Sequence, residues 1–216
     1  MSQFRLLSVV CLIAAAVGLL PRSLSATQVG AEVSGAAVYV YCVGCHGHHG
    51  EGGDGGRNPR LAGLSVAYLD RQLHAFKTGQ RVNKPMLPIF SHPQFTADII
   101  ATVAEYIAAM PVPDLALWPY RPDPVALAEF QSRGALRAAG EARYDSICAA
   151  CHAANGAGDE DQGAPSLTAQ YPAYLRKQIL DFANGARTHD ASGRCGDLAP
   201  PMIEAVLAHL VELGRP

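Results

Sequence analysis

The sequence has no excess of positive charge. Its 216 residues include 17 lysine and arginine residues against 19 aspartate and glutamate residues. Arg5 and Arg22 lie within the segment 1–26, which contains no acidic side chain, so the remainder of the chain is mildly acidic. A mildly acidic protein is a poor match for the phosphate backbone of nucleic acids. We therefore expect no nucleic-acid partner.

The N-terminal apolar run is too short for a typical membrane span. It extends from Leu6 to Leu20, whereas a bilayer-crossing helix needs about 20 apolar residues. Arg5 precedes the run and the small-residue segment SLSA follows it, which is typical of a secretory signal. We predict that residues 1–26 are a signal peptide for export to the periplasm and that Cys11 is removed with it. A retained membrane anchor is the alternative.

The cysteines are too few and too unevenly placed for a disulfide framework. Six are present, and removal of Cys11 leaves an odd number, which disfavours full pairing. Four of the rest lie in two copies of one motif: Cys42-x-x-Cys45-His46 and Cys148-x-x-Cys151-His152. Neither copy is accompanied by the second cysteine pair that a tetrahedral zinc site would need.

The spacing of this motif suits a haem group. Both thiols can bond to the vinyl groups of one haem, and the adjacent histidine can then bind the iron. A redox dithiol is the other interpretation, but the histidine directly after the second cysteine in both copies favours haem. We predict two covalently bound haem c groups.

The two motifs belong to an internal repeat. A shift of the chain that places Cys42 on Cys148 continues without a gap until Arg81 meets Arg187. Before the last helix the shift becomes shorter by three, so the second copy has lost three residues after Arg187. Such a register indicates two copies of one domain. The expected boundaries are 27–109 for the first domain, 110–134 for a proline-rich connector and 135–216 for the second domain.

Strand signals are scarce, and we predict an all-α fold. Leu69, Leu73 and Phe76 recur at helical spacing, as do their counterparts in the second copy, and predict helices over 67–77 and 173–184. Each copy should add a short helix that runs into the motif and a terminal helix. A domain of about 95 residues has a small core, so a large apolar cofactor would help it fold.

A proline follows each motif histidine at the same interval. Pro59 follows His46 at the spacing at which Pro165 follows His152. A metal-bound imidazole usually donates its other N–H to a fixed acceptor, which orients the ring. A proline can hold its carbonyl in place without offering a competing donor. We predict that Pro59 and Pro165 support the two histidines in this way.

The repeated segments resemble the cytochrome c4 family. The similarity rests on CVGCHGHHGEGG, PRLAGLSVAYLDRQLHAFKTGQR and ADIIATVAEYIAAM in the first copy, and on CAACHAANGAG and PSLTAQYPAYLRKQILDFANGAR in the second. It runs from about Ser34 to Leu213. The resemblance implies two tandem cytochrome c domains in pseudo-twofold packing, with haem propionates near their interface. The same architecture occurs in the dihaem subunit of flavocytochrome c sulfide dehydrogenases.

The resemblance also implies a methionine as the sixth ligand of each iron. Met86 fits this role in the first copy, and a thioether ligand raises the reduction potential. The second copy has no methionine at the expected place, and its three-residue deletion makes the alignments disagree. His189 is the favoured candidate and would give a bis-histidine haem of lower potential. Cys195, as a thiolate, and Met202 stay open as alternatives.

Arg81 and Arg187 occupy equivalent positions of the two repeats, and the sequence leaves two interpretations of their role open. They could neutralise haem propionates, or they could form surface salt bridges.

Together these features favour a periplasmic dihaem c-type cytochrome that transfers electrons between respiratory or sulfur-oxidising partners. An iron with both axial positions filled by protein has no open site for substrate, so we expect a carrier and not an enzyme. The expected partners are redox proteins: cytochrome oxidase, quinol-cytochrome c reductase or a sulfide-oxidising flavoprotein, with docking to a membrane complex included. The alternatives are the electron-accepting subunit of such a flavoprotein and a dihaem sulfur-compound oxidoreductase with a special second haem.

Overall fold

The computed structural model describes residues 33–114, 120–189 and 198–214, which belong to one unit. The predicted signal peptide and Cys195 lie outside these residues. Within the described part, no helix is both long and apolar enough to cross a membrane.

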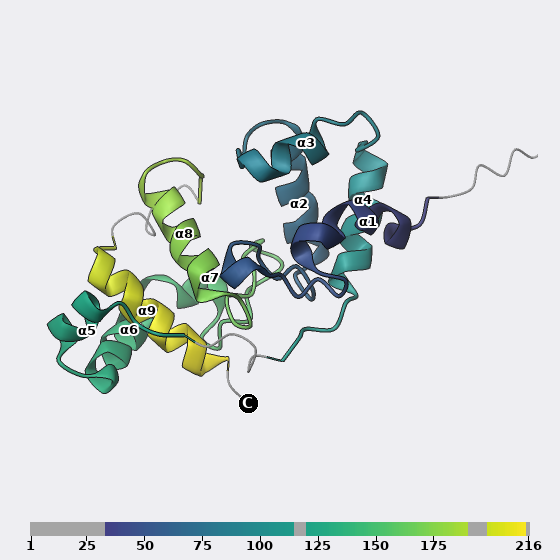
Figure 1. The fold of residues 1–216 in the computed structure, drawn as a ribbon. Helices are drawn as coiled ribbons and strands as arrows, with labels where there is room; N and C mark the ends of the chain where they lie inside the picture. The colour runs from purple at the N-terminus through teal and green to yellow at the C-terminus, as the bar shows by residue number, and fades with distance from the viewer. Residues whose placement is uncertain (1–32, 115–119, 190–197, 215–216) are drawn as a thin grey trace, which may run out of the picture. The chain divides into compact units, whose positions relative to one another are not determined.

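The first half of the unit consists of short helices and turns (Figure 1). They are α1 (Gly35–His46), η1 (Asp54–Gly56), α2 (Val66–Lys77), η2 (Lys84–Met86), α3 (Leu87–Phe90) and α4 (Ala97–Ala108). The three long helices each begin after a hydroxyl side chain that accepts a hydrogen bond from a free N–H of the first turn: Ser34, Ser65 and Thr96. The expected helix over 67–77 corresponds to α2.

The second half repeats the three long helices of this plan and adds one helix. Its elements are α5 (Pro124–Phe130), α6 (Arg133–Ile147), α7 (Ala149–His152), α8 (Pro172–Ala183) and α9 (Pro200–Leu213). Of these, α6 and α7 stand in place of α1, and α5 is the addition. The described residues contain no strand, only two isolated bridges, Gly53 with Asn58 and Asp159 with Ala164, which occupy equivalent positions of the two repeats. The predicted all-α fold is confirmed.

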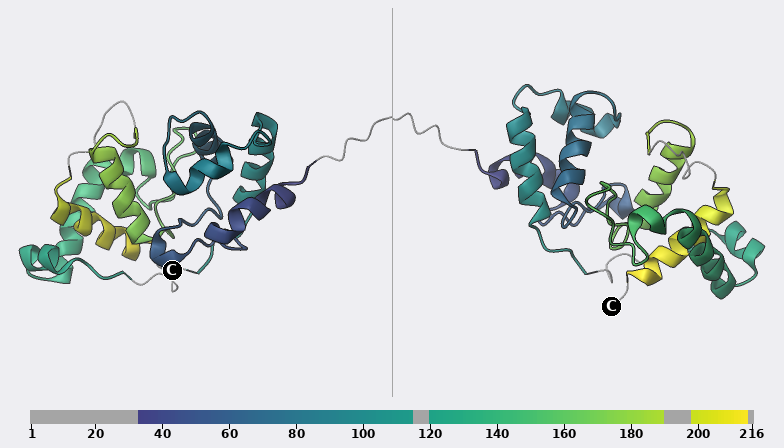
Figure 2. Two further views of the ribbon diagram at one scale, coloured as in Figure 1. Left: turned by 45° about the horizontal axis from the view of Figure 1, so that its top comes forward. Right: turned by 180° about the vertical axis from the view of Figure 1, so that it is seen from behind.

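Each half is organised around a crossing of its motif-bearing helix and its terminal helix. In the first half α1 packs on α4, and in the second α6 packs on α9 (Figure 2). Tyr39 on α1 lies 5.7 Å from the ring of Tyr106, and Tyr144 on α6 lies 5.3 Å from the ring of His209. The crossing therefore places equivalent aromatic contacts behind both motifs.

The same two tyrosines hold the chain just after each motif. The Tyr39 hydroxyl donates to the carbonyl of Gly47 at 2.8 Å, and the Tyr144 hydroxyl donates to the carbonyl of Ala153 at 2.7 Å. Burial is the main cause that raises the pKa of both hydroxyls above the ordinary tyrosine value. Both side chains thus stay neutral donors, and each ties the C-terminal end of its motif to the core.

The connector expected at 110–134 is tied to the second half by a buried carboxylate. Glu204 on α9 is 5% exposed, and its Oε2 accepts hydrogen bonds from Tyr120 Oη at 2.8 Å, Asp123 N at 3.2 Å and Arg176 Nη2 at 2.9 Å. Burial acts to raise the pKa of Glu204, but the hydrogen bonds from Arg176 and Tyr120 outweigh it and lower the pKa. Beyond these contacts α5 packs on α6 and α9.

The α6–α9 crossing predicts a large effect of a single methyl group. A Cβ at Gly140 would lie 1.9 Å from the carbonyl oxygen of Ala205, so Gly140→Ala must push the helices apart. We expect a loss of about 1–3 kcal/mol in unfolding free energy, measured by thermal unfolding of the holoprotein with circular dichroism. Gly134→Ala is the matched control in the same helix, because its Cβ would meet nothing closer than 3.9 Å. An equal melting temperature for Gly140→Ala and wild type would contradict the packing.

Glu204→Gln should destabilise the second half in a pH-dependent way. The lowered pKa means that the ionised carboxylate stabilises the fold above the pKa of the unfolded chain, and that this stabilisation disappears as the pH falls through the folded pKa. At neutral pH we expect a loss of about 2 kcal/mol, typical of hydrogen bonds to a charged group. Denaturant titrations across the acid range should show wild type and variant converging at low pH, whereas a constant difference would contradict the assignment.

Candidate functional site

The motif histidines are buried and held in one tautomer. His46 ends α1 and His152 ends α7, and each is 6% exposed. The Nδ1 atom of each lies 2.9 Å from a proline carbonyl oxygen, that of Pro59 or Pro165. A carbonyl can only accept, so Nδ1 carries the hydrogen and Nε2 is the nitrogen whose lone pair can bind a metal. Burial lowers the pKa of His46, against the opposing effect of the Pro59 carbonyl, and favours this neutral form.

Glycines allow the chain to fold back and deliver each proline carbonyl. Gly52 donates to the carbonyl of His46, and Gly158 donates to that of His152, both at 2.9 Å. Both glycines have positive φ, +83° and +86°, where a side chain is strained. A Cβ would also lie only 2.6 Å from the Asn58 carbonyl oxygen in the first half and 2.5 Å from the Ala164 carbonyl oxygen in the second. The tight loop therefore requires glycine at these two repeat-related positions.

The surroundings of the thiols argue against a redox dithiol or a bare metal ion. Burial, together with the neighbouring Cys45, raises the pKa of the Cys42 thiol to about 11. Redox-active cysteines have lowered thiol pKa values instead. In the described part of the chain, no group of three or more His, Cys, Asp or Glu side chains is placed to hold a metal ion.

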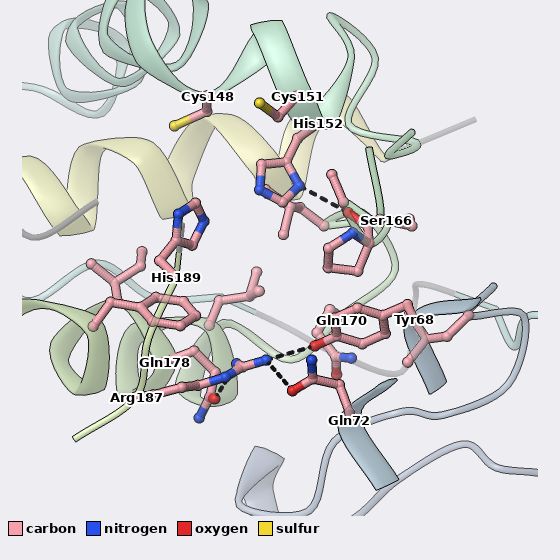
Figure 3. Close-up of a pocket in the computed structure, with 18 of the residues that line it drawn as sticks. Tyr68, Gln72, Cys148, Cys151, His152, Ser166, Gln170, Gln178, Arg187 and His189 are labelled. Carbon is pink, nitrogen blue, oxygen red and sulfur yellow. Dashed lines mark hydrogen bonds between the residues drawn. The ribbon is translucent and has the colours of Figure 1, made fainter. Parts of the chain in front are cut away.

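The second motif opens onto a cavity of about 710 Å³ (Figure 3), within the range of cofactor sites. Cys148, Cys151 and His152 line one side, as Figure 3 shows. Apolar side chains form much of the remaining wall: Leu167, Leu175, Ile179, Phe182, Leu198, Val206 and Leu210. Arginines contribute the charged groups, and none of the described lining residues is acidic. Such a wall fits a cofactor with a large apolar ring and acidic substituents, which are the properties of haem.

His189 faces His152 across this cavity. Their ring centroids are 6.1 Å apart at an interplanar angle of 43°, and Figure 3 shows the two rings pointing toward one another. Two imidazoles that bind one metal ion from opposite sides, with bonds of about 2.0 Å, have ring centroids about 6 Å apart. Phe182 contacts the edge of His189 with a centroid distance of 4.7 Å. The geometry therefore leaves room for one iron between the two rings.

The structure does not place Met202 in the wall of this cavity. This residue of α9 is half-buried and packs against both core clusters of the second half, the one with α5 and α6 and the one that includes Cys148, but it is not among the described residues that line the cavity. In the first half, Met86 ends η2, is half-buried and packs against the first core cluster. Met110, the other methionine of that half, follows α4 and lies beside Gly50. Cys195 is outside the described residues.

Sequence reasoning overlooked several first-half residues that line the second cavity. Tyr68, Arg71 and Gln72 contribute to its wall although they belong to the other repeat, together with Arg81, which the sequence had already singled out. The only sequence feature that relates Tyr68, Arg71 and Gln72 to this site is the repeat, which aligns them with residues of α8. No local motif could show that they cross to the other half.

The family model for cytochrome c matches residues 33–111 and 137–204. The chain belongs to the cytochrome c family. Each matched region contains one Cys-x-x-Cys-His motif, and the protein carries two covalently bound haem c groups, attached at Cys42 and Cys45 and at Cys148 and Cys151.

Individual relatives point to the same branch of this family. Cytochrome c4 of Pseudomonas aeruginosa is 34% identical over 134 residues, which is 61% of each chain, so the alignment spans less than two thirds of that relative. A thiosulfate dehydrogenase electron acceptor of Stutzerimonas stutzeri is 32% identical and is matched over 73% of this chain and 71% of its own length. The crystal structure of reduced cytochrome c4 from Pseudomonas stutzeri superposes with a TM-score of 0.66 at 27% identity, covering 82% of this chain and 95% of that one. The predicted family and the two-domain cytochrome fold are confirmed.

Proposed function

We propose that the protein is a periplasmic dihaem electron carrier whose two haems have different axial ligands. A bound haem supplies one-electron oxidation and reduction at its iron. The observation that carries the proposal is the opposed pair His152 and His189, 6.1 Å apart across the second cavity. An iron with protein ligands on both sides has no position for substrate, which is the property of a carrier.

We assign the ligands as follows. His46 and Met86 bind the first iron, and His152 and His189 bind the second. The position of His189 in the cavity wall supports this choice over Met202, which is not among the described lining residues. Methionine ligation raises the reduction potential relative to a second histidine. Electrons should therefore pass from the second haem to the first.

We also propose the domain limits and the location expected from the sequence. The two regions matched by the family model support domains at 27–109 and 135–216. Residues 1–26 are proposed as the signal peptide that directs export to the periplasm, on the basis of their apolar run and small-residue segment.

The ligand assignment predicts two distinct spectroscopic signatures in the oxidised holoprotein. Near-infrared magnetic circular dichroism should show a methionine-ligated haem that is lost in Met86→Ala, because this removes the thioether from the first iron. Low-temperature EPR should show a bis-histidine haem that is lost in His189→Ala. Met202→Leu is the matched control, since it changes a methionine of the core that is not among the described residues lining the cavity.

Two results would overturn the assignment of the second haem. If wild type shows two methionine-ligated haems and one of them disappears in Met202→Leu, the sixth ligand of the second haem is Met202 and not His189. If a thiolate signature is present and disappears in Cys195→Ala, the ligand is Cys195, and this result would favour an enzyme of sulfur chemistry. Redox titration supplies an independent measure, because the haem changed in His189→Ala should be the one with the lower potential in wild type.

A second candidate names one electron donor. One relative of this chain is a thiosulfate dehydrogenase electron acceptor, with 32% identity over 161 residues. We propose that a thiosulfate-oxidising dehydrogenase reduces this protein, and that its two one-electron centres accept the electrons in turn. Each electron would then enter at the low-potential second haem and pass on to the first haem.

The donor can be tested by stopped-flow absorbance. Oxidised protein mixed with the thiosulfate dehydrogenase of Stutzerimonas stutzeri and thiosulfate should become reduced at a rate that saturates with the concentration of this chain. Mixtures without enzyme or without thiosulfate serve as controls. Failure of the complete mixture to reduce either haem, while dithionite reduces both, would exclude this donor and leave the carrier function intact.

A further inference from the structure

Two neighbouring residues of α2 hold one residue of the segment that carries Met86. The ring of Phe76 stacks on the ring of Phe90, with centroids 5.6 Å apart and an interplanar angle of 21°. The ammonium group of Lys77 donates hydrogen bonds to the carbonyl oxygens of Phe90 at 3.1 Å and of His92 at 3.0 Å. Phe90 is thus bound through its side chain by one residue of α2 and through its backbone by the next.

Phe90 fixes the position of the segment to which it belongs. The short helix α3 connects Met86 to Phe90 and packs on α2 (Figure 1). A helix of one turn is not stable alone, so its position depends on tertiary contacts. Phe90 is 5% exposed, and its ring centroid also lies 5.3 Å from that of Phe95. A buried anchor at one end of so short a helix determines where Met86 lies at the other end.

The same anchor is connected to the helix that carries the first motif. The ring of Phe95 contacts the ring of Tyr41 in an edge-to-face arrangement, with centroids 5.8 Å apart. Tyr41 lies on α1 and directly precedes Cys42. Aromatic pairs in such geometries stabilise packing beyond the area that they bury. The row of rings from Phe76 through Phe90 and Phe95 to Tyr41 therefore links the Met86 segment to the helix that attaches the haem.

The second half lacks the charged part of this arrangement. The repeat aligns Phe76 with Phe182 but Lys77 with Ala183. The ring of Phe182 contacts His189 itself, with centroids 4.7 Å apart. The aromatic residue of α8 thus touches the proposed ligand directly, whereas that of α2 contacts the segment behind the ligand. The lysine therefore occurs only in the half whose proposed sixth ligand is methionine.

We infer that Phe76 and Lys77 form a clamp that holds Met86 against the first iron, with Lys77 as its positioning residue. The inference rests on the proposed function, since it needs Met86 as the sixth ligand. A soft thioether suits iron less well than an imidazole does, so Met86 keeps its place only while the surrounding chain holds it there. Release of Phe90 from α2 would let Met86 leave the iron and would open that position to an external ligand.

Imidazole titration of the oxidised holoprotein tests the clamp. Imidazole can bind the first iron only in molecules in which Met86 has left it, so its apparent affinity follows the population of that open state. In Lys77→Ala, which introduces the residue of the second half, we expect this affinity to rise about tenfold, as loss of a hydrogen bond from a charged group typically causes. The measurement is the imidazole concentration that abolishes the methionine signature in near-infrared magnetic circular dichroism.

Three further variants separate the contact from other effects. Lys77→Arg keeps the charge and the donor groups and should stay close to wild type. Phe90→Leu removes the ring stacking but keeps the carbonyl acceptor, so it should shift the titration in the same direction as Lys77→Ala. It also provides the decisive comparison if Lys77→Ala incorporates little haem. Lys84→Ala removes an exposed lysine of the same segment and should leave the titration unchanged.

The clamp would be overturned by any of three results. An unchanged imidazole midpoint in Lys77→Ala would remove the role of Lys77, and one in Phe90→Leu that of Phe90, even if the melting temperature falls. An equal shift in Lys84→Ala and Lys77→Ala would assign the effect to net charge and not to the contact. Failure of the proposed function looks different, because the methionine signature would then be absent from wild type before any imidazole is added, and the clamp would fail with it.

Discussion

The hydrogen bond between each motif histidine and the carbonyl of the proline that follows it is the interaction on which both haem sites depend. It sets which ring nitrogen carries the proton, so that the other nitrogen is the one that would bind the iron in the proposed assignment. Gly52 and Gly158, which lie between histidine and proline, make this short return of the chain sterically possible. The buried tyrosines Tyr39 and Tyr144 then hold the chain after each histidine against the helix crossing.

The two halves share this interaction, but they differ on the side of each site that faces the motif histidine. The first half keeps the turn η2 that ends at Met86. The second has lost three residues before its terminal helix, and His189 lies where the cavity is closed opposite His152. In the proposed ligand assignment, a small deletion in a loop replaces a methionine ligand by a histidine, while the core helices and the histidine–proline pair are preserved. Duplicated domains can become unequal in this way without a change of fold.

The junction of the halves adds a constraint that neither repeat has alone. Arg60, 1% exposed, donates to backbone carbonyls of the other half, and burial lowers its pKa to about 10. Arg81 and Arg187 cross in both directions. Each cross-contact satisfies polar groups that would otherwise be buried without partners. Arg81 and Arg187 therefore both hold the halves together and line the cavity of the second half.

The sequence by itself determined the helical fold, the repeat and the two haem attachment sites, because these depend on periodicity and on residues close together in the chain. It also singled out Pro59 and Pro165, since their spacing from the histidines is equal. The cavity wall and the partners of Arg81 and Arg187 were decided only by the tertiary structure. Tyr68 and Gln72 lie far from Arg187 along the chain, in the other repeat, and a contact over that separation is set by how the two halves pack, which no local pattern records.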